Sequence, residues 1–333
     1  MSDMLTMIQT LGEQLRWSLG LDPVEVPPAT EIVLAGMGGS GVAGDYLAAI
    51  AGEGPTRVAV HKNYGPLPGW VGRTKPLVLA VSYSGNTEET LDVVDHARSR
   101  GLSVVTITTG GKLGQLSDAE GWPSVRVPTG LQPRAAVGYL VGAAVHVSAA
   151  VGAVDDPRSD LEEAALLADD ALTEDSPAWE QAAKTAAALK GRIGIVYGGG
   201  PVSGTVAGRW KTQINENAKM PAWSSLLPEL DHNELVGWET MPSFTREHLG
   251  VIALTDRSDH PRVEARLAHS AALTQDAVPW VAEIPSWGES RIARLISLTT
   301  VGDLTSWMMA LDAGVDPVPV ETIEKLKKLL TED

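Results

Sequence analysis

Two spacings of apolar residues alternate along this chain, and each spacing predicts a type of element. Short apolar runs that end in Gly, Ser or Thr are typical of strands buried on both faces of a parallel sheet, whereas apolar residues three and four apart are typical of helices. In the first half, the predicted strands cover residues 31–35, 57–60, 77–82, 103–108 and 124–127. The predicted helices cover residues 1–20 and 140–153, and two more end near Ile50 and Arg100. The proline-rich stretch 22–30 is predicted to be a connector.

The same alternation returns in the second half, after an acidic, alanine-rich stretch at 156–190 that predicts one or two helices. Strands are predicted at residues 192–197, 250–254 and 278–284, and helices at 206–216, 260–273, 292–311 and 320–329. The first strands of the two halves are about 160 residues apart, which indicates a repeated unit. We therefore expect an α/β fold of two doubly wound, parallel-sheet domains in tandem, at residues 1–153 and 154–333.

Composition narrows the classes of function. The chain has 333 residues, which is long for one domain and suits two. Its formal net charge of −16 argues against a nucleic-acid partner, because such binding needs clustered Lys and Arg. It has no Cys, so disulfides, thiolate metal sites and a Cys nucleophile are excluded. No apolar run reaches the roughly 20 residues of a membrane span and no basic leader is visible, so we expect a cytoplasmic protein without a membrane partner.

A glycine-rich turn after the first predicted strand is the clearest sign of a ligand. The run Gly36-Met-Gly-Gly-Ser-Gly41 directs backbone N–H groups at one point at a helix start, where the helix dipole favours a phosphate. The run also fits the G-x-G-x-x-G pattern of dinucleotide sites. That alternative expects a carboxylate about 20 residues later. The stretch Val58-Ala-Val-His61-Lys62 has none, and we therefore favour a phosphate.

A second loop, Ser82-Tyr-Ser84-Gly-Asn-Thr87, has three hydroxyl groups at the carboxyl end of the third predicted strand. Hydroxyl donors without a Lys suit a phosphate monoester better than a nucleoside triphosphate, which would need the P-loop Lys. The alternative is that Ser84 or Thr87 only caps the next helix, with Glu88 and Glu89 favouring its dipole. A cap needs one hydroxyl, however, and not three. The second half has no equivalent of this loop, so we expect one phosphate site per chain.

Three further stretches carry side chains suited to acid–base chemistry. Arg134 lies in a proline-braced loop, Glu216 lies among amides at a helix end, and His232 lies among carboxylates in a turn. Taken singly, they could be a surface ion pair, a solvated helix residue and a helix cap. Taken together beside a site for a sugar phosphate, they fit the movement of a carbonyl between C1 and C2. In that reaction a carboxylate carries the proton, a His acts on the ring oxygen and a guanidinium stabilises the enediolate.

With these stretches the chain resembles the sugar isomerase (SIS) domain proteins, and within them the bifunctional phosphoglucose/phosphomannose isomerases. The matching stretches are residues 36–45, 82–90, 132–136, 215–217 and 228–234, which span both halves in order. The resemblance implies two flavodoxin-like SIS domains and a homodimer. It also implies a metal-independent and cofactor-free interconversion of glucose 6-phosphate or mannose 6-phosphate with fructose 6-phosphate through a cis-enediol.

The resemblance also implies a role for each matching site residue. The residues expected to hold the phosphate are Gly39, Ser40, Ser82, Ser84 and Thr87. Arg134 is expected to stabilise the enediolate, Glu216 to move the proton, and His232 to assist ring opening in the active site of the other subunit. Such an arrangement would make a monomer inactive.

A Lys on the last helix also takes part in this family's reaction. Of the candidates Lys325, Lys327 and Lys328, we choose Lys327 because it follows the apolar pair Ile323 and Leu326. The chain departs from the family in two positions, since Ala218 and Trp223 stand where Ser and Phe are common, and both could narrow the pocket or change its preference between sugars. The alternatives are a non-catalytic phosphosugar-binding protein and another SIS chemistry, such as hexulose-phosphate isomerisation or glucosamine-phosphate deamination.

Overall fold

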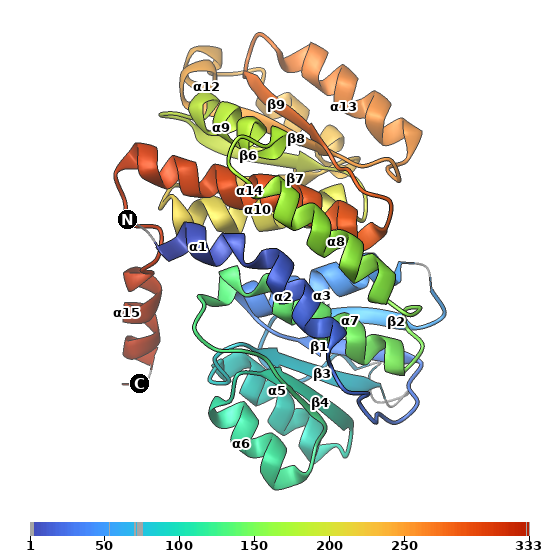
Figure 1. Ribbon diagram of the computed structural model, residues 1–333. Coiled ribbons are helices and arrows are strands. Elements are labelled where there is room, and N and C mark those ends of the chain that lie inside the picture. Colours follow the sequence, from blue (N-terminus) through green and yellow to red (C-terminus); the bar gives the residue numbers. More distant parts are fainter. Residues whose placement is uncertain (1–2, 53, 70, 72–75, 331, 333) are drawn as a thin grey trace.

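The structure, a computed structural model, describes residues 3–52, 54–69, 71, 76–330 and 332. Two parallel sheets form its framework, one from each half of the chain (Figure 1). Sheet A has the strand order β2-β1-β3-β4-β5, and sheet B has the order β7-β6-β8-β9. In each sheet the chain starts at an inner strand and later crosses to its other side, as in doubly wound folds. The predicted α/β fold with two parallel-sheet units is confirmed.

The elements alternate along the chain as the apolar pattern predicts. In the first half they are α1 (Asp3–Gln9), α2 (Leu11–Leu19), β1 (Glu31–Ala35), α3 (Gly38–Ala51), β2 (Arg57–His61), β3 (Leu77–Ser82), α5 (Glu88–Ser99), β4 (Ser103–Thr108), α6 (Gly111–Glu120), β5 (Ser124–Arg126), η1 (Pro133–Ala135) and α7 (Val137–Ala150). In the second half they are α8 (Arg158–Ala171), α9 (Pro177–Ala188), β6 (Ile193–Gly198), α10 (Ser203–Asn217), β7 (Ala222–Leu226), η2 (Glu229–His232), α11 (Glu234–Gly237), α12 (Pro242–His248), β8 (Leu249–Thr255), α13 (Pro261–Thr274), β9 (Trp280–Pro285), α14 (Arg291–Ala313) and α15 (Glu321–Leu330).

Helices cover both faces of sheet A, which explains the unbroken apolar runs of its inner strands. Ile32 and Leu34 of β1 belong to a core that also contains residues of α3 and α7. Val33 and Ala35 belong to a separate core that contains residues of α5. Because successive side chains of a strand point to opposite faces, a strand covered on both faces is apolar along its buried run, as in residues 32–35 of β1 and 77–81 of β3.

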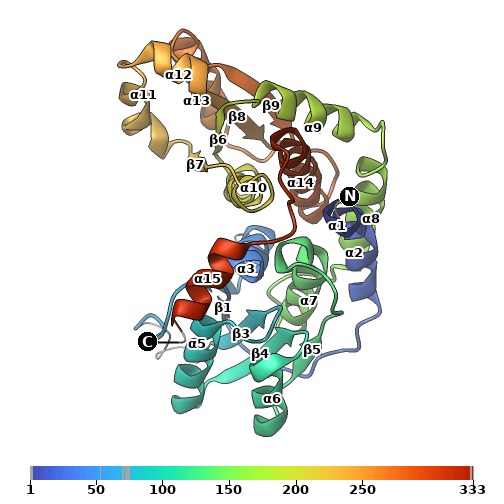
Figure 2. The same ribbon diagram turned by 90° about the vertical axis from the view of Figure 1, so that its left-hand side faces the viewer.

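A layer of helices lies between the two sheets, as Figures 1 and 2 show. The layer contains α1, α2, α8, α10 and α14, and one apolar core runs through it from sheet A to sheet B. Within it, α14 packs against α8, α9 and α10. Helix α10 also contacts α3, so the end of α10 reaches the loops of sheet A.

The structure differs from the predicted elements in a few places. The helix predicted at residues 1–20 is interrupted at Thr10, and the stretch 156–190 forms two helices, α8 and α9. The apolar pattern does not predict α6, β7 or α12. Strand β7 lies at the edge of sheet B and exposes Trp223 and Leu226, so it lacks the apolar run of a strand covered on both faces. The domain boundary between residues 153 and 154 stays a prediction.

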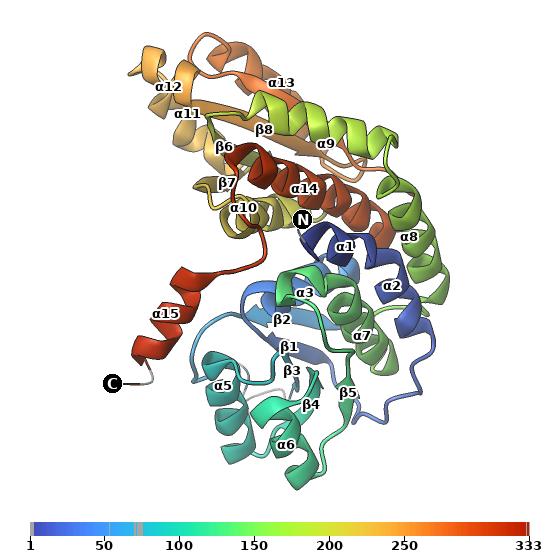
Figure 3. The same ribbon diagram turned by 60° about the vertical axis from the view of Figure 1, so that its left-hand side comes forward.

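Helix α15 stands apart from both sheets (Figure 3). Residues 314–320, which we call the connector, join it to α14. None of its residues from Glu321 to Leu330 is buried, although Ile323, Leu326 and Leu329 are apolar. Among the described helices, none combines the length and the apolar character needed to cross a membrane.

Candidate active site

The two predicted phosphate loops lie side by side at the carboxyl edge of sheet A. Strands β1 and β3 are neighbours, so the turns that follow Ala35 and Ser82 meet at the same edge. The backbone N–H of Tyr83 donates to Ser40 Oγ over 3.1 Å and joins the two loops directly. Ser40 keeps its own hydroxyl proton for donation. The first N–H groups of α3 have no partner within the helix, and they begin at this edge, so the site suits an anion.

Ser82 and Thr87 face each other in the second loop. Their hydroxyl oxygens are 2.8 Å apart, so one donates to the other and the pair keeps one proton for a ligand. Thr87 occupies the N-cap position of α5 without a side-chain capping hydrogen bond. Ser84 is exposed, and its hydroxyl accepts from the N–H of Asn86 over 3.2 Å. The capping alternative therefore does not explain the hydroxyl of Thr87.

A third loop packs against the first through a glycine. A Cβ on Gly39 would lie 2.6 Å from the carbonyl oxygen of Pro133, which is closer than a side chain permits. Only Gly allows this approach. The contact brings η1, and with it Arg134, against the first turn of α3. The three loops of sheet A thus form one continuous site.

Arg134 is buried, and its guanidinium makes hydrogen bonds on several sides. Its Nε donates to Asn217 Oδ1 over 2.7 Å, and its Nη2 donates to the carbonyl oxygens of Pro317 and Val318 over 2.6 and 2.8 Å. Its Nη1 lies 3.6 Å from Glu216 Oε2. Burial lowers the pKa of Arg134, while the charge of Glu216 opposes that shift. The structure therefore brings Arg134 and Glu216 together.

A closed set of hydrogen bonds supports Arg134 from the interior. Asn217 Nδ2 donates to Ser306 Oγ over 3.0 Å, and Ser306 Oγ donates to the carbonyl of Asp303 over 2.9 Å. The Asp303 carboxylate accepts from Arg209 Nη2 over 2.7 Å, and the same Nη2 donates to the carbonyl of Arg134 over 3.1 Å. No sequence motif predicts the role of Arg209, Asp303 or Ser306 in this support. A lone Arg and a lone Asp within apolar helical segments were the available signal, because buried charges need partners.

Glu216 lines a cavity of about 580 Å³ between the end of α10, the connector and the first turn of α15. This volume is in the range of small-molecule sites. Lys219 lines the same cavity, whereas Ala218 is buried and Trp223 is exposed on β7, and neither lines it. Among the described residues, no three His, Asp or Glu side chains are grouped as a metal ion would require.

His232 and Glu216 lie at opposite edges of sheet B. Helix α10 starts at the carboxyl edge, after β6, and runs back, so Glu216 near its end lies at the amino edge. Strand β7 then returns to the carboxyl edge over about 13 Å, and His232 follows it. His232 is exposed and, among the described residues, makes no hydrogen bond or ion pair with Arg134 or Glu216.

The residues on either side of His232 tie its turn to sheet B. Asp231 accepts hydrogen bonds from Arg266 and Ser270 of α13, each over 2.9 Å. Glu234 accepts a hydrogen bond from the hydroxyl of Tyr197 on β6. These two anchors hold the turn while the imidazole stays at the surface. Such an arrangement presents His232 to whatever meets this edge of the sheet.

Lys327 lies on α15 and is exposed. Among the residues that the structure describes, Glu321, Thr322 and Ile323 of the same helix line the Glu216 cavity, but Lys327 does not. Lys325 pairs with Glu321, one helical turn away, over 3.6 Å. The structure therefore does not bring Lys327 to Glu216, and the choice among the three lysines stays a prediction.

Lys62, for which the sequence predicts no role, lies beside the first phosphate loop. A Cβ on Gly41 would be 3.0 Å from Lys62 Cε, so this side chain runs along the first turn of α3. Its Nζ pairs with Asp45 of the same helix. Burial raises the pKa of Asp45, and the ion pair with Lys62 opposes that rise. Lys62 therefore already has an ion-pair partner within the chain.

The glycine-rich turn of the second half already holds an anion of its own. Ser203 Oγ accepts from the N–H groups of Gly199 and Gly200, each over 3.0 Å. The same hydroxyl lies 2.9 and 3.1 Å from the two carboxylate oxygens of Asp259. A Cβ on Gly200 would be 1.9 Å from this carboxylate. The negative charge repels a phosphate, which supports the expectation of one phosphate site per chain.

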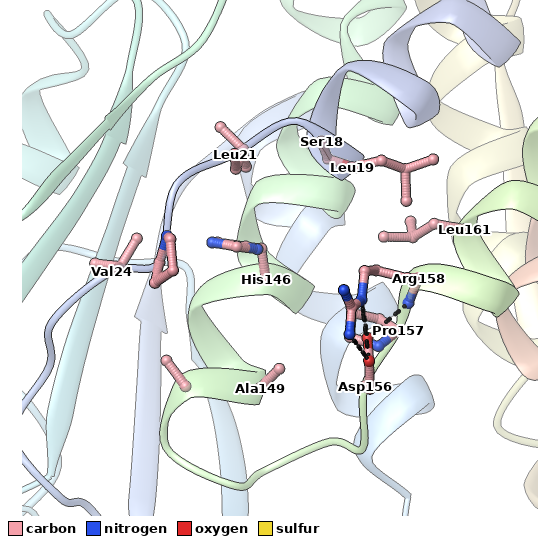
Figure 4. A pocket seen from close by; sticks show the side chains of 12 residues that line it. Ser18, Leu19, Leu21, Val24, His146, Ala149, Asp156, Pro157, Arg158 and Leu161 are labelled. Carbon is pink, nitrogen blue, oxygen red and sulfur yellow. Dashed lines mark hydrogen bonds and ion pairs between the residues drawn. The ribbon is translucent and has the colours of Figure 1, made fainter.

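A second cavity of about 580 Å³ lies away from these loops, beside α2, α7 and α8 (Figure 4). Side chains such as Leu21 and Leu161 make its walls mostly apolar. Arg158 donates to the Asp156 carboxylate over 2.9 Å, and His146 is hydrogen-bonded with a backbone carbonyl over 3.0 Å. The basic side chains lining this cavity are thus already paired, so it suits a phosphate less well than the loops of sheet A.

Known proteins resemble this chain along its length. The SIS domain family matches residues 28–120, and the bacterial phospho-glucose isomerase C-terminal SIS domain matches residues 179–330. A bifunctional phosphoglucose/phosphomannose isomerase of Caldicellulosiruptor bescii is 35% identical over 314 residues, which are 93% of this chain and 92% of the relative. A protein of the same name from Thermoplasma acidophilum is 36% identical over 328 residues, which are 97% and 96% of the two chains.

The fold is also shared with solved structures of low sequence identity. The C-terminal domain of glucosamine-fructose-6-phosphate aminotransferase from Francisella tularensis superposes with a TM-score of 0.70 at 13% identity. The superposition covers 95% of this chain and 97% of that domain. At this identity the likeness concerns the fold alone.

Proposed function

Because the chain belongs to the bifunctional phosphoglucose/phosphomannose isomerase family and is a phosphosugar isomerase, we propose that it interconverts glucose 6-phosphate or mannose 6-phosphate with fructose 6-phosphate. One observation carries the proposal. A guanidinium and a carboxylate, those of Arg134 and Glu216, approach within 3.6 Å beside loops rich in phosphate donors.

The phosphate group anchors the substrate in this proposal. The hydroxyls of Ser40, Ser82, Ser84 and Thr87 donate to it, together with backbone N–H groups at the start of α3, including that of Gly39. The helix dipole adds partial positive charge at the same place. With the phosphate fixed, C1 and C2 of the open-chain sugar lie toward Arg134 and Glu216.

The proton transfer then needs only these two side chains. The Glu216 carboxylate takes the proton from C2 of the aldose, and the electron pair forms the C1–C2 double bond while O1 becomes negative. Arg134 stabilises this cis-enediolate through its N–H groups. A proton passes from O2 to O1, and Glu216 returns its proton to C1, which leaves the carbonyl at C2. The guanidinium carries the charge stabilisation, so the proposed step is metal-independent and uses no cofactor.

Ring opening requires a further acid–base group, and we assign it to His232 of the partner subunit in a homodimer. The separation of His232 and Glu216 at opposite edges of sheet B supports this assignment, because one sugar does not reach both within one chain. The anchored turn around His232 supports it as well. Lys327 stays a candidate for contacts with the sugar hydroxyls.

A coupled assay with fructose 6-phosphate, in which glucose 6-phosphate and mannose 6-phosphate are detected separately, tests the proposal. We expect turnover by the wild type and a loss of about 10²- to 10⁴-fold in kcat for Glu216→Gln, which keeps the shape of the side chain but not its basicity. The exposed Glu239→Gln is the matched control and should leave kcat unchanged. An inactive wild type that still binds fructose 6-phosphate would instead identify a phosphosugar-binding protein.

A further inference from the structure

Lys219, two residues after the end of helix α10, has an unusual backbone conformation. Its φ is +57°, in the left-handed region that helix ends normally reserve for Gly or Asn. A Lys at such a position is an outlier that the surrounding structure must hold in place. Its side chain lines the cavity of Glu216.

The ammonium group of Lys219 is bound by backbone carbonyls from two parts of the chain. Its Nζ donates to the carbonyl of Glu216 on α10, and to the carbonyls of Pro317 and Pro319 on the connector over 3.2 and 2.6 Å. Lys219 therefore ties the end of α10 to the segment that leads into α15.

Arg134 binds the same segment. Its Nη2 donates to the carbonyls of Pro317 and Val318, so two cations share one short stretch of backbone. Both N–H groups of Nη2 are taken up by connector carbonyls, and Nη1 has a long contact of 3.4 Å with Gln132 Oε1. An enediolate that is bound through both Nη1 and Nη2 must therefore displace at least one connector carbonyl. In the proposed reaction Arg134 exchanges a hydrogen bond to the connector for one to the substrate. The hydrogen bonds from Lys219 to the connector are kept, because the proposed reaction does not use its ammonium group as a substrate ligand.

We propose that Lys219 is a positioning residue, which keeps the connector and α15 beside Glu216 while Arg134 exchanges connector carbonyls for substrate oxygens. This inference rests on the proposed role of Arg134. The carboxylates of Asp316 and Glu216 line the same cavity as Lys219. The Lys219 ammonium therefore also offsets negative charge at the place where the enediolate is proposed to form. Burial lowers the pKa of Lys219, and the charge of Arg134 lowers it further, in opposition to Asp316.

The position of α15 can be measured without any turnover. The chain has no Cys, so Glu324→Cys on α15 and Asp95→Cys on α5 provide two unique spin-label sites, both exposed. Double electron–electron resonance, on labelled chains diluted with an excess of unlabelled chains, reports the distance within one chain. We expect one narrow distance distribution in the otherwise unchanged protein, with or without saturating fructose 6-phosphate.

Three variants distinguish the effect of the Lys219 ammonium group from the effect of its backbone conformation. Lys219→Met removes the donors and keeps the stem, Lys219→Gly removes the donors and relieves the positive φ, and Lys219→Arg keeps a cation. We expect Met and Gly to broaden the distribution at least about twofold, more so with fructose 6-phosphate, and Arg to preserve it. A distribution in Lys219→Met as narrow as in the parent, or a parent already as broad as that variant, overturns the inference.

Kinetics distinguish positioning from general stability. We expect Lys219→Met and Lys219→Gly to lower kcat about tenfold with little change in KM, since the phosphate loops are untouched. Lys219→Gly should unfold thermally no earlier than the wild type because its backbone is unstrained. A loss of activity that follows thermal stability across the variants would contradict the inference. The distance measurement does not depend on turnover, so it tests the positioning role of Lys219 even if the proposed reaction is wrong. Failure of the inference and failure of the proposed function can therefore be distinguished.

Discussion

Glu216 and His232 are close in sequence yet lie at opposite edges of sheet B, because strand β7 runs the full depth of the sheet between them. Reacting groups must come within about 3–3.5 Å of the atoms they act on. One sugar phosphate beside Glu216 is therefore out of reach of His232 of the same chain. The two side chains can serve one substrate only in an assembly in which the edge of one sheet B meets the site of another chain.

The first prediction concerns mixtures of two inactive variants. Glu216→Gln and His232→Gln should each lose activity, while refolded or exchanged mixtures should recover it. In a two-fold dimer, random mixing gives about a quarter of the sites both native side chains, so we expect about one quarter of the wild-type kcat. The measurement is the fructose 6-phosphate assay before and after subunit exchange. Mixtures as inactive as their components would mean that each site is built from a single chain.

The second prediction tests the close approach of the phosphate loops. Gly39→Ala puts a Cβ 2.6 Å from the Pro133 carbonyl. We expect it to destabilise the fold by about 1–3 kcal/mol and to raise KM for fructose 6-phosphate at least about tenfold, because the loops must separate.

Gly38→Ala is the matched control for Gly39→Ala. Its φ of +51° makes a side chain costly, by about 1–2 kcal/mol, but a Cβ there meets nothing within 4 Å. Comparable destabilisation with a much smaller rise in KM is expected. Equal changes in KM for the two variants would show that loop spacing does not determine affinity.

The third prediction concerns the residue that orients Arg134. Asn217→Ala leaves Arg134 Nε without its acceptor and removes the N–H that Ser306 Oγ accepts, although Ser306 keeps its bond to Asp303. We expect a loss of about 1–3 kcal/mol in unfolding free energy and a larger fall in kcat than in affinity, because the guanidinium is no longer aimed. Thr185→Ala is the control, since it removes a buried hydrogen bond within α9, to the carbonyl of Gln181, that is not part of the Arg134 network. Unchanged kcat in Asn217→Ala would remove this residue from the mechanism.

The fourth prediction is a pH dependence of stability. Burial would raise the pKa of Asp256, but hydrogen bonds from Ser258 and Ser286 and the charge of Arg294 outweigh it, so the pKa is lowered. A carboxyl whose pKa is lower folded than unfolded stabilises the fold above its unfolded pKa of about 3.9, and this contribution is lost as pH falls through the folded pKa.

Asp256→Asn should therefore destabilise the protein by about 3 kcal/mol at pH 7, because it leaves Arg294 unpaired, and by less at pH 3.5. Urea unfolding at both pH values measures the difference. Asp276→Asn, at an exposed position, should have no effect at either pH. A penalty for Asp256→Asn that is the same at both pH values would contradict the assignment.

The sequence predicts the elements that have a clear apolar pattern of their own. It misses elements that can be recognised only from residues far away in the sequence. Strands such as β1 and β3 carry unbroken apolar runs, at residues 32–35 and 77–81, because helices cover both of their faces. Strand β7 is at an edge, and its exposed Trp223 and Leu226 give no such pattern. An edge strand is recognisable only once its neighbour in the sheet is known.

The same distinction applies to the site. The hydroxyls of Ser82 and Thr87 come together because one short loop carries both. The support of Arg134 joins α10 to α14 through the Asn217–Ser306 and Arg209–Asp303 contacts, whose partners lie far apart in the sequence. A single sequence does not indicate which residues that are far apart in the chain contact one another in the fold. The role of Lys219 is equally hidden, because it depends on carbonyl groups that every residue has.

The carboxylate of Asp259 has a consequence for how the protein takes up its ligand. This carboxylate belongs to the same chain as Ser203, so its effective concentration at the Ser203 turn is higher than that of a dissolved sugar phosphate. It therefore competes strongly with a sugar phosphate for this turn. We therefore expect the Ser203 turn, already occupied by the Asp259 carboxylate, to bind no sugar phosphate. Binding isotherms for a sugar phosphate should saturate at one molecule per chain, without a weaker second phase that would hold substrate away from Glu216.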